Sequence, residues 1–341
     1  MIDKKLKRPM LDPFQPRLTP DMLMPATKEE REQLIQMRES ATFWRDAMRR
    51  FKRNKVAMFC AFVLILIALF AYAGPFFMPY TYDQLIRGHE RLPPMLNPYF
   101  HPFGTDQLGR DLRVRVMVGT RISLLIGIVA SLFVLVIGTV YGAVSGFVGG
   151  VVDMVMMRVA EIINSIPNVM MIILLQVSFK EPLTNLFNRG GMRAFSSFGV
   201  GLISIFITFA LLYWVPMAQL VRGEILALKN SEYVTASRAL GGKGRWIIFR
   251  HLIPNSVGTI IVTTMFQIPT AIFTESFLSF IGLGVNAPLA SLGSLVNDSL
   301  TGFQTFPYRL IIPAVMIAVI ILALNQLGDG LRDAIDPKIR D

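Results

Sequence analysis

Six long uncharged stretches dominate this sequence of 341 residues. Each runs for 18 residues or more without Asp, Glu, Lys or Arg, and they are 56–82, 122–152, 162–179, 194–221, 251–274 and 310–328. A helix of about 20 apolar residues crosses the ~30 Å hydrocarbon core of a bilayer. The backbone must satisfy its own hydrogen bonds there, which leaves helices or closed barrels. Barrel strands alternate over about 10 residues, so these longer uniform stretches favour helices.

The sequence therefore predicts an all-α integral membrane protein with six transmembrane helices. We place them at 56–78, 122–147, 154–178, 199–221, 257–282 and 308–327. Charged residues make up only 17% and hydrophobic residues 53%, whereas soluble domains carry about 25% and 45–50%. This argues against a soluble enzyme. The chain is basic overall, but its sequence offers no basic polar domain that could bind nucleic acid. The single cysteine, Cys60, argues against disulfides or a Cys-based zinc site.

Basic residues set the predicted orientation. Residues 1–55 hold 14 Lys and Arg against 8 Asp and Glu, and end in RRFKRNK just before the first span. Because Lys and Arg collect on the cytoplasmic side, 1–55 is predicted to be a basic cytoplasmic tail and not a signal peptide. The loop 222–250 has six Lys and Arg against two Glu and agrees. Six spans then return the C-terminus to the cytoplasm. Four arginines before the second span disagree: Arg110, Arg113, Arg115 and Arg121.

This topology gives a first testable prediction. A reporter that is active only outside the cytoplasm, fused after Gly88, is expected to be active because Gly88 follows the first span. The same reporter fused after Lys229, in the loop 222–250, is expected to be silent. Silence after Gly88 would reverse the predicted orientation.

The loop 222–257 contains a short helix signal. It begins RGEILALKNSEYVTASRALGG, in which Ser231 suits an N-cap and Glu232 the first helical turn. The segment 232–240 then predicts about two and a half turns, which Gly241 and the glycine after it end. Small residues among larger apolar ones would let the backbone sink into a cleft on another protein.

The spacing in this loop resembles the EAA motif of ABC importer permeases, which is E-A-A, three residues, G, nine residues, I, one residue, L-P. Thr235, Ala236 and Ser237 stand at the first three positions, and Thr235 leaves no acidic group there. Gly241 stands at the glycine, His251 and Ile253 at the apolar positions and Pro254 at the proline. In that family the loop forms a coupling helix that docks on the ATP-hydrolysing subunit. The resemblance implies this ATPase-coupling role for Glu232, Tyr233, Thr235, Ala236, Ser237, Arg238, Gly241 and Pro254.

Three further stretches look like the C-type permeases of oligopeptide, dipeptide and nickel importers. They are HPFGTDQLGRDLRVRVMVGTRISL (101–124), ESFLSFIGLGVNAPLASLGSLV (275–296) and NQLGDGLRDAIDPK (325–338). A fourth, VDMVMMRVAEIINSIP (152–167), is most similar to oligopeptide-type members. The resemblance runs from about 41 to 341 and implies a type I ABC importer permease fold. It divides the chain after the first span into a periplasmic loop (79–121), a core permease domain (122–327) and a cytoplasmic C-terminal tail (328–341).

The resemblance also implies partners and a location. It implies a heterodimer with a second permease subunit, two ATP-binding subunits that hold ATP and Mg, and a periplasmic or lipid-anchored peptide-binding protein. The chain itself is expected to bind no cofactor and to be no enzyme, since it lacks a GxxxxGK[ST] loop. The location implied is the bacterial cytoplasmic (inner) membrane, as a multi-pass protein. Dipeptides, nickel or another small solute remain open as substrates. A distant alternative is an ion-coupled secondary transporter, which predicts paired broken helices that we do not find.

Ionisable and polar residues inside spans raise functional hypotheses, because burying them in lipid is expensive. The candidates for the translocation path are Glu161, Asn164 and Glu275. Glu161 can instead pair with Arg158, three residues earlier on the helix. Glu275 can instead bond Ser276, Ser279 or a group of a partner chain.

The histidine and aspartates of HPFGTDQLGRD raise a different question. His101, Asp106 and Asp111 would suit a metal or an acid–base site. The glycine-rich turn sequence favours a structured external loop, in which an aspartate bonds the local backbone. No HExxH-type pairing supports a metal.

Overall fold

The computed structural model describes residues 43–96, 100–189, 199–285 and 289–335. The chain divides into two compact units, 1–46 and 47–341, and the second contains all the membrane helices. In the described residues the elements are helices and turns with two isolated bridges. Within these described ranges, six helices are long and apolar enough to cross a membrane, which is the predicted number: Lys55–Tyr72, Leu112–Val148, Asn168–Asn188, Gly199–Leu228, Val257–Phe280 and Tyr308–Ile335.

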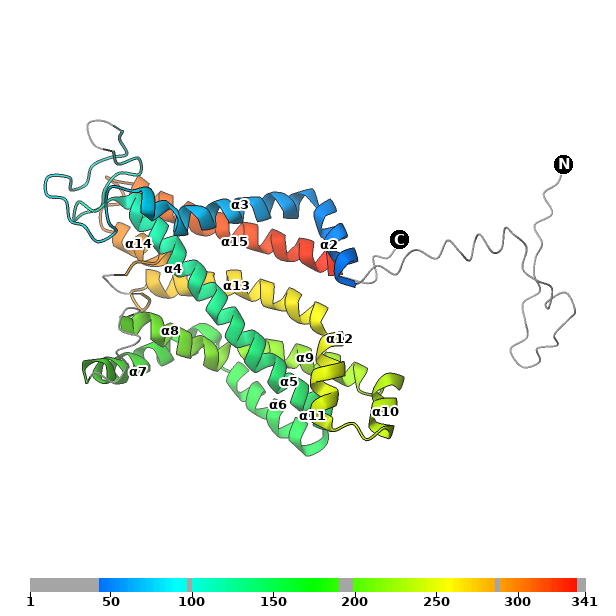
Figure 1. Cartoon of the computed structure of the whole chain (residues 1–341). Coiled ribbons are helices and arrows are strands. Elements are labelled where there is room, and N and C mark those ends of the chain that lie inside the picture. The colour runs from blue at the N-terminus through cyan, green and yellow to red at the C-terminus, as the bar shows by residue number, and fades with distance from the viewer. Residues whose placement is uncertain (1–42, 97–99, 190–198, 286–288, 336–341) are drawn as a thin grey trace, which may run out of the picture. The chain divides into compact units, whose positions relative to one another are not determined.

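The chain order of the helices is simple (Figure 1). Helix α2 covers Phe43–Arg53 and precedes the first membrane helix, α3 (Lys55–Tyr72). The others are α4 (Leu112–Phe133), α5 (Thr139–Val148), α6 (Gly150–Asn164), α7 (Asn168–Asn188), α8 (Gly199–Leu212), α9 (Trp214–Leu228), α10 (Glu232–Ala239), α11 (Gly244–Ile247), α12 (Ile253–Asn255), α13 (Val257–Phe280), α14 (Leu292–Ser299) and α15 (Tyr308–Ile335). Two π-helical turns, Val134–Gly138 and Ile248–Leu252, join α4 to α5 and α11 to α12.

The second membrane helix starts ten residues before its predicted start at 122. Asp111 caps it, since its Oδ1 accepts a hydrogen bond from the Val114 amide at 3.0 Å. The predicted loop 79–121 therefore ends at Asp111. Arginines that made 112–121 look like loop belong to the first turns of α4, where Arg115 is buried in an ion pair with Asp106.

The predicted third span, 154–178, is two helices in the structure. Helix α6 ends at Asn164 and α7 begins at Asn168, and of the two only α7 is long and apolar enough to span. Pro167 explains the break, because proline has no amide hydrogen to donate and restricts the residue before it. The third span is therefore Asn168–Asn188.

Helix α15 continues past its predicted end at 327, so most of the predicted tail 328–341 is helical. It runs to Ile335, where the described residues end. Gly330 explains how it packs, because a Cβ there would overlap the Ala57 Cβ on α3. Only a glycine allows the two helices to approach this closely.

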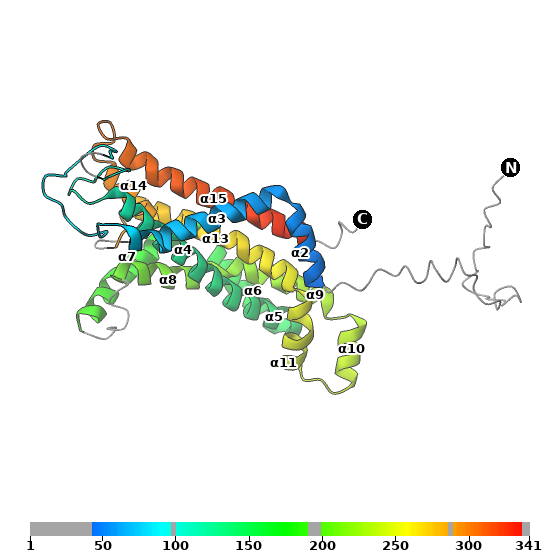
Figure 2. The same ribbon diagram turned by 45° about the horizontal axis from the view of Figure 1, so that its top comes forward.

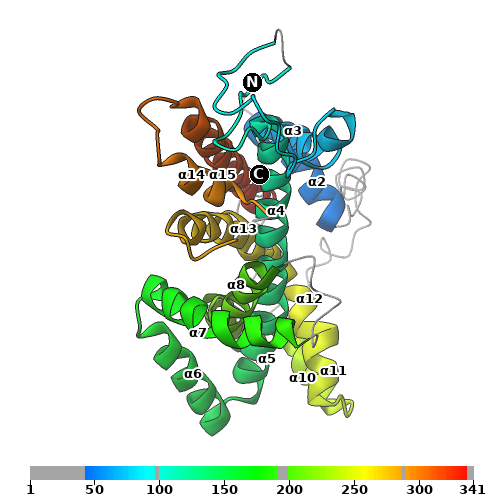
Figure 3. The same cartoon turned by 90° about the vertical axis from the view of Figure 1, so that its left-hand side faces the viewer.

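Apolar side chains hold the helices together in several clusters. One joins α3, α4, α13, α14 and α15, and includes Leu112, Ile272, Leu292 and Ile320. Figure 3 shows α13 and α15 beside α4 in this group. A second joins α5, α9, α10 and α13, and includes Met217, Val234 and Ile260. Figures 1 and 2 both place α14 and the first turn of α4 at one end of the molecule and α10 at the opposite end.

Candidate functional site

Helix α10 occupies nearly the predicted range 232–240. Ser231 is its N-cap residue, but the expected side-chain cap is absent, because the Ser231 hydroxyl donates to the Leu228 carbonyl at 2.6 Å. The amide of Thr235 bonds the Ser231 carbonyl at 3.1 Å instead. Gly241 ends the helix with φ +81°, the left-handed conformation expected of a glycine after a helix.

Only one face of α10 is buried. Val234 is fully buried and packs with Ile225, Ile247 and Leu252, and Ser237 lies on the same face three residues later. The predicted coupling residues on the rest of the helix are exposed: Glu232, Tyr233, Thr235, Ala236 and Arg238. Pro254 is exposed in α12. Val234 therefore anchors the helix, and the exposed face carries polar and small side chains.

The C-terminal end of α10 is tied to α5. The Gly242 amide bonds the Ser237 carbonyl at 2.9 Å, and the Arg238 guanidinium lies 5.2 Å from the centre of the Phe147 ring. Gly244 passes so close to Phe147 that a Cβ would lie 2.8 Å from its ring. The Arg238–Phe147 contact thus joins α10 to α5, and the Gly242 bond closes the turn that follows α10.

A salt bridge that the sequence analysis missed fixes the helix leading into α10. Asp153, in the first turn of α6, accepts from Arg222 on α9 at 2.5 and 2.6 Å. Ser145 also donates to Asp153, at 2.5 Å. The hydrogen bond from Arg222 is the largest cause of a lowered pKa for the Asp153 carboxyl. Because 69 residues separate the partners, no local pattern reveals the pair.

Asp153→Asn is expected to destabilise the chain. The charged pair contributes about 1–2 kcal/mol, less than a buried pair would, because the Arg222 side chain is 34% exposed. A pKa lowered by folding stabilises the protein above the unfolded pKa of about 3.9, and this stability is lost as pH falls through the folded pKa. Thermal melting in detergent should show wild type above Asp153→Asn at pH 7, with the gap closing in acid.

The control for this prediction is Asp83→Asn, because Asp83 is exposed on a loop. Its melting temperature should equal that of wild type. Equal melting of Asp153→Asn and wild type at pH 7 would contradict the prediction.

Glu275 lies in the interior of this chain. It is fully buried, its Oε2 accepts from Ser123 at 3.1 Å and its Oε1 accepts from Ser279 at 2.7 Å. Those hydroxyls in turn accept from the amides of Leu292 and Val285. The structure thus favours the serine-bonded alternative, in which Glu275 joins α4 and α13 to the start of α14.

Glu161 and Asn164 lie on α6. Arg158 donates to Glu161 at 2.9 Å, and the two side chains are 72% and 56% exposed. Asn164 is the last residue of α6 and is also exposed. The Arg158–Glu161 pairing is therefore present, whereas a place on the translocation path stays a prediction.

The HPFGTDQLGRD segment folds as a structured loop. Asp106 accepts from the Leu108 and Arg110 amides, as an aspartate in a turn does. His101 is fully buried and bonds Asp111 at 2.7 Å. Among the described residues no group of three His, Cys, Asp or Glu side chains is arranged to hold a metal.

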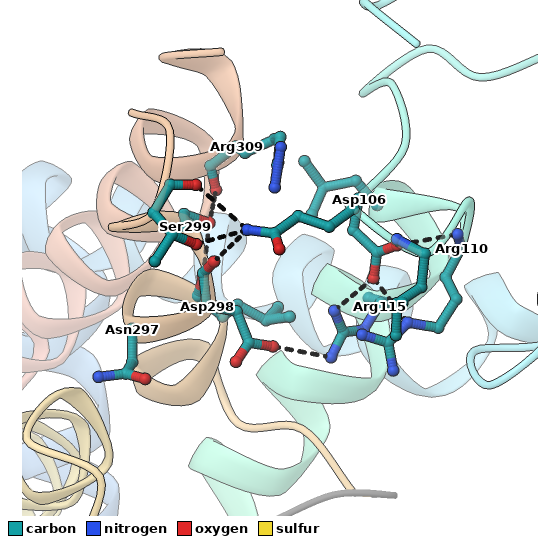
Figure 4. Close-up of a pocket in the computed structure, with 12 residues that line it drawn as sticks. Asp106, Arg110, Arg115, Asn297, Asp298, Ser299 and Arg309 are labelled. Carbon is teal, nitrogen blue, oxygen red and sulfur yellow. Dashed lines mark hydrogen bonds and ion pairs between the residues drawn. The ribbon is translucent and has the colours of Figure 1, made fainter. Parts of the chain in front are cut away.

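The same loop accounts for two of the four arginines that opposed the predicted topology. Arg110 and Arg115 both pair with Asp106, at 2.6 and 2.7 Å, and Arg115 also reaches Asp298 (Figure 4). Their charges are neutralised by partners that include a residue 183 positions away. Sequence reasoning missed Asp298 for that reason.

Comparisons with known proteins agree with this architecture. The family described as "Binding-protein-dependent transport system inner membrane component" matches residues 138–341. The family "N-terminal TM domain of oligopeptide transport permease C" matches residues 42–94.

Individual relatives match over most of their length. The oligopeptide transport system permease protein OppC of Bacillus subtilis is 42% identical over 303 residues, 89% of this chain and 92% of that protein. OppC of Escherichia coli K12 is 41% identical over 302 residues, 89% and 93% of the two chains. The dipeptide transport system permease protein DppC of B. subtilis is 41% identical over 304 residues, 89% and 88%.

The chain therefore belongs to the family of inner-membrane permease components of binding-protein-dependent transport systems. Its N-terminal match and its relatives make it an OppC-type permease. Among solved structures, a chain of the MetNI methionine ABC transporter in an inward-facing form has a TM-score of 0.49 at 16% identity, over 65% of this chain and 96% of that one.

Proposed function

We propose that this chain is a transmembrane subunit of an ATP-driven importer and translocates oligopeptides delivered by a substrate-binding protein. The observation that carries the proposal is α10. It is a short helix with one buried face, an exposed small-residue face and a left-handed glycine at its end. The oligopeptide substrate is supported by the OppC relatives at 41–42% identity.

In the proposed mechanism α10 acts as a lever. ATP and Mg bind to separate ATPase subunits, whose closure moves the exposed face of α10. The motion passes to α9, because Val234 of α10 packs against Ile225 of that helix. The helices then switch between inward-open and outward-open states, and the free energy comes from the different ATP affinity of the two states.

A second permease subunit would cover apolar surface that this chain leaves exposed. Helices α6 and α7 expose many apolar side chains, including Val151, Met154, Ile162, Met170 and Leu174. Lipid would cover most of these, but the exposed Arg158–Glu161 pair on α6 would be costly in lipid. This pair therefore favours a partner chain or a water-filled path beside α6.

The proposed assembly contains two permeases, two ATPases and a binding protein outside the cell, with both termini of this chain in the cytoplasm. Dipeptides are the main alternative substrate, because DppC of B. subtilis is as similar as the OppC relatives. A glutathione permease, GsiD of Pectobacterium atrosepticum, is 33% identical and shows how substrates vary among relatives.

Uptake in a strain that lacks this gene tests the proposal. Complementation with wild type should restore uptake of peptides longer than two residues, and abolishing ATP hydrolysis in the partner ATPases should remove it. Restoration of dipeptide or nickel uptake alone would change the substrate. Uptake that follows an ion gradient after ATP depletion would favour a secondary transporter instead.

A further inference from the structure

A charged cavity is lined by residues of α14 and of the first turns of α4 (Figure 4). These elements lie at the end of the molecule opposite α10 (Figure 1), and nothing in the proposed mechanism uses the cavity. Its volume is about 360 Å³. The loop 106–110, the first turns of α4, the second half of α14 and the start of α15 form its walls. Five charged side chains line it: Asp106, Arg110, Arg115, Asp298 and Arg309.

One of the two carboxylates in the cavity is already saturated. Asp106 Oδ2 accepts from Arg110 and Arg115 at 2.6 and 2.7 Å, and its Oδ1 accepts two amides. Asp298 accepts one bond from Arg115, at 3.3 Å, and its side chain is 51% exposed. These carboxylates thus compensate Arg110 and Arg115.

Arg309 is the cation that remains. The residue is only 3% exposed, and its guanidinium lies 5.4 Å from the centre of the Phe306 ring. Among the described residues no carboxylate lies within ion-pairing distance of it. Arginine stays charged in proteins, and a buried charge is costly without a counter-ion. The cavity therefore holds three guanidiniums against two carboxylates.

We propose that this cavity binds a carboxylate side chain of the substrate-binding protein, with Arg309 as its principal partner. A carboxylate supplies the missing negative charge, and its two oxygens match the fork of a guanidinium. A cavity of this size accepts an Asp or Glu side chain. The proposal rests on the proposed function, in which a binding protein docks outside the cell.

The walls of the cavity favour a docking protein over the substrate as the source of the carboxylate. They come from a loop and from helix ends, and not from the middle of the membrane helices. A group on a protein that approaches this end of the molecule would reach them first. Asp298, half exposed beside Arg115, would repel that group weakly.

The test measures the dissociation constant between the assembled transporter in lipid nanodiscs and its own binding protein. Arg309→Gln should weaken binding about tenfold or more and reduce its salt dependence. Asp298→Asn should strengthen binding, because it removes the competing negative charge. Arg309→Lys should fall between wild type and Arg309→Gln. Arg87→Gln, at an exposed arginine in the loop before α4, is the control and should leave the affinity unchanged.

The opposite signs separate docking from misfolding. A variant that merely damages the fold weakens binding, so strengthening by Asp298→Asn keeps the test valid if Arg309→Gln folds poorly. Unchanged or equally weakened binding in Arg309→Gln and Asp298→Asn would overturn the proposal.

A second arm compares transport of a peptide with that of its C-terminal amide. The carboxylate proposed here belongs to the binding protein, so Arg309→Gln should change the KM of both peptides equally. A rise in the KM of the free acid alone, with the KM of the amide unchanged, would assign the cavity to the substrate and overturn the proposal. If the wild-type transporter bound no substrate-binding protein, that result would instead reject the proposed function.

Discussion

Gly241→Val is expected to reduce substrate uptake at least about tenfold while the chain still inserts into the membrane. Gly241 has φ +81°, which a β-branched residue adopts only with strain of about 1–2 kcal/mol or more. The strain would act on the turn that ends α10, where the Gly241 amide bonds the Arg238 carbonyl at 2.9 Å. A displaced α10 would not seat on the ATPase. Uptake and ATP hydrolysis by the purified complex measure this directly.

Two variants control for the side chain itself. A Cβ at Gly241 or at Gly223 meets no atom within 4 Å, so both positions have space, but only Gly241 has the left-handed backbone. Gly223→Val should therefore transport far better than Gly241→Val. Gly241→Asn should also retain transport, because asparagine tolerates this conformation.

Ala236→Asp, on the exposed face, should uncouple transport as Gly241→Val does. Normal uptake by Gly241→Val would refute the assignment of α10.

Glu275→Leu is expected to have the second large effect, a loss of folded protein. It would leave the buried hydroxyls of Ser123 and Ser279 without their acceptor, at about 1–3 kcal/mol each. The loss would also free the start of α14, since Ser279 bonds Ser291, its N-cap residue, at 3.2 Å. Melting temperature and the yield of monodisperse protein in detergent measure the effect.

Glu275→Gln distinguishes lost hydrogen bonds from lost shape. Its amide oxygen can accept from one serine while its amide group donates to the other, so it should retain most of the stability. Thr120→Val is a matched control, because the Thr120 hydroxyl is buried and has no hydrogen-bond partner within the described part of the chain. It should be close to neutral. Equal melting of Glu275→Leu and wild type would show that the serine cluster contributes nothing.

The membrane helices could be predicted from sequence because length and lack of charge act locally. Helix α10 could be predicted for a similar reason, since Ser231, Gly241 and the residues between them are neighbours. The start of the second membrane helix could not, because the arginines after Asp111 look exposed until Asp298 is known to lie beside them. The break at Pro167 does have a local signal, because proline cannot donate the amide hydrogen bond that would continue the helix.

The interior polar contacts were harder to predict than the helices. Ser279 lies one turn from Glu275 and was foreseen, but Ser123 lies 152 residues away. The Asp153–Arg222 pair and the cavity around Arg309 likewise join distant segments. The order of residues in a single sequence does not reveal which distant residues pair.

The unusual length of the second membrane helix gives the two ends of the molecule one shared mechanical part. From Leu112 to Val148 it is 37 residues long, about 55 Å, nearly twice the ~30 Å hydrocarbon core. Arg115 near its start lines the cavity, and Phe147 near its end contacts Arg238 of α10. A tilt imposed at either end displaces the other, as in a rod. Kinks in long helices often occur at π-helical turns, so a bend of this rod is expected at Val134–Gly138 and would reduce the tilt that it transmits.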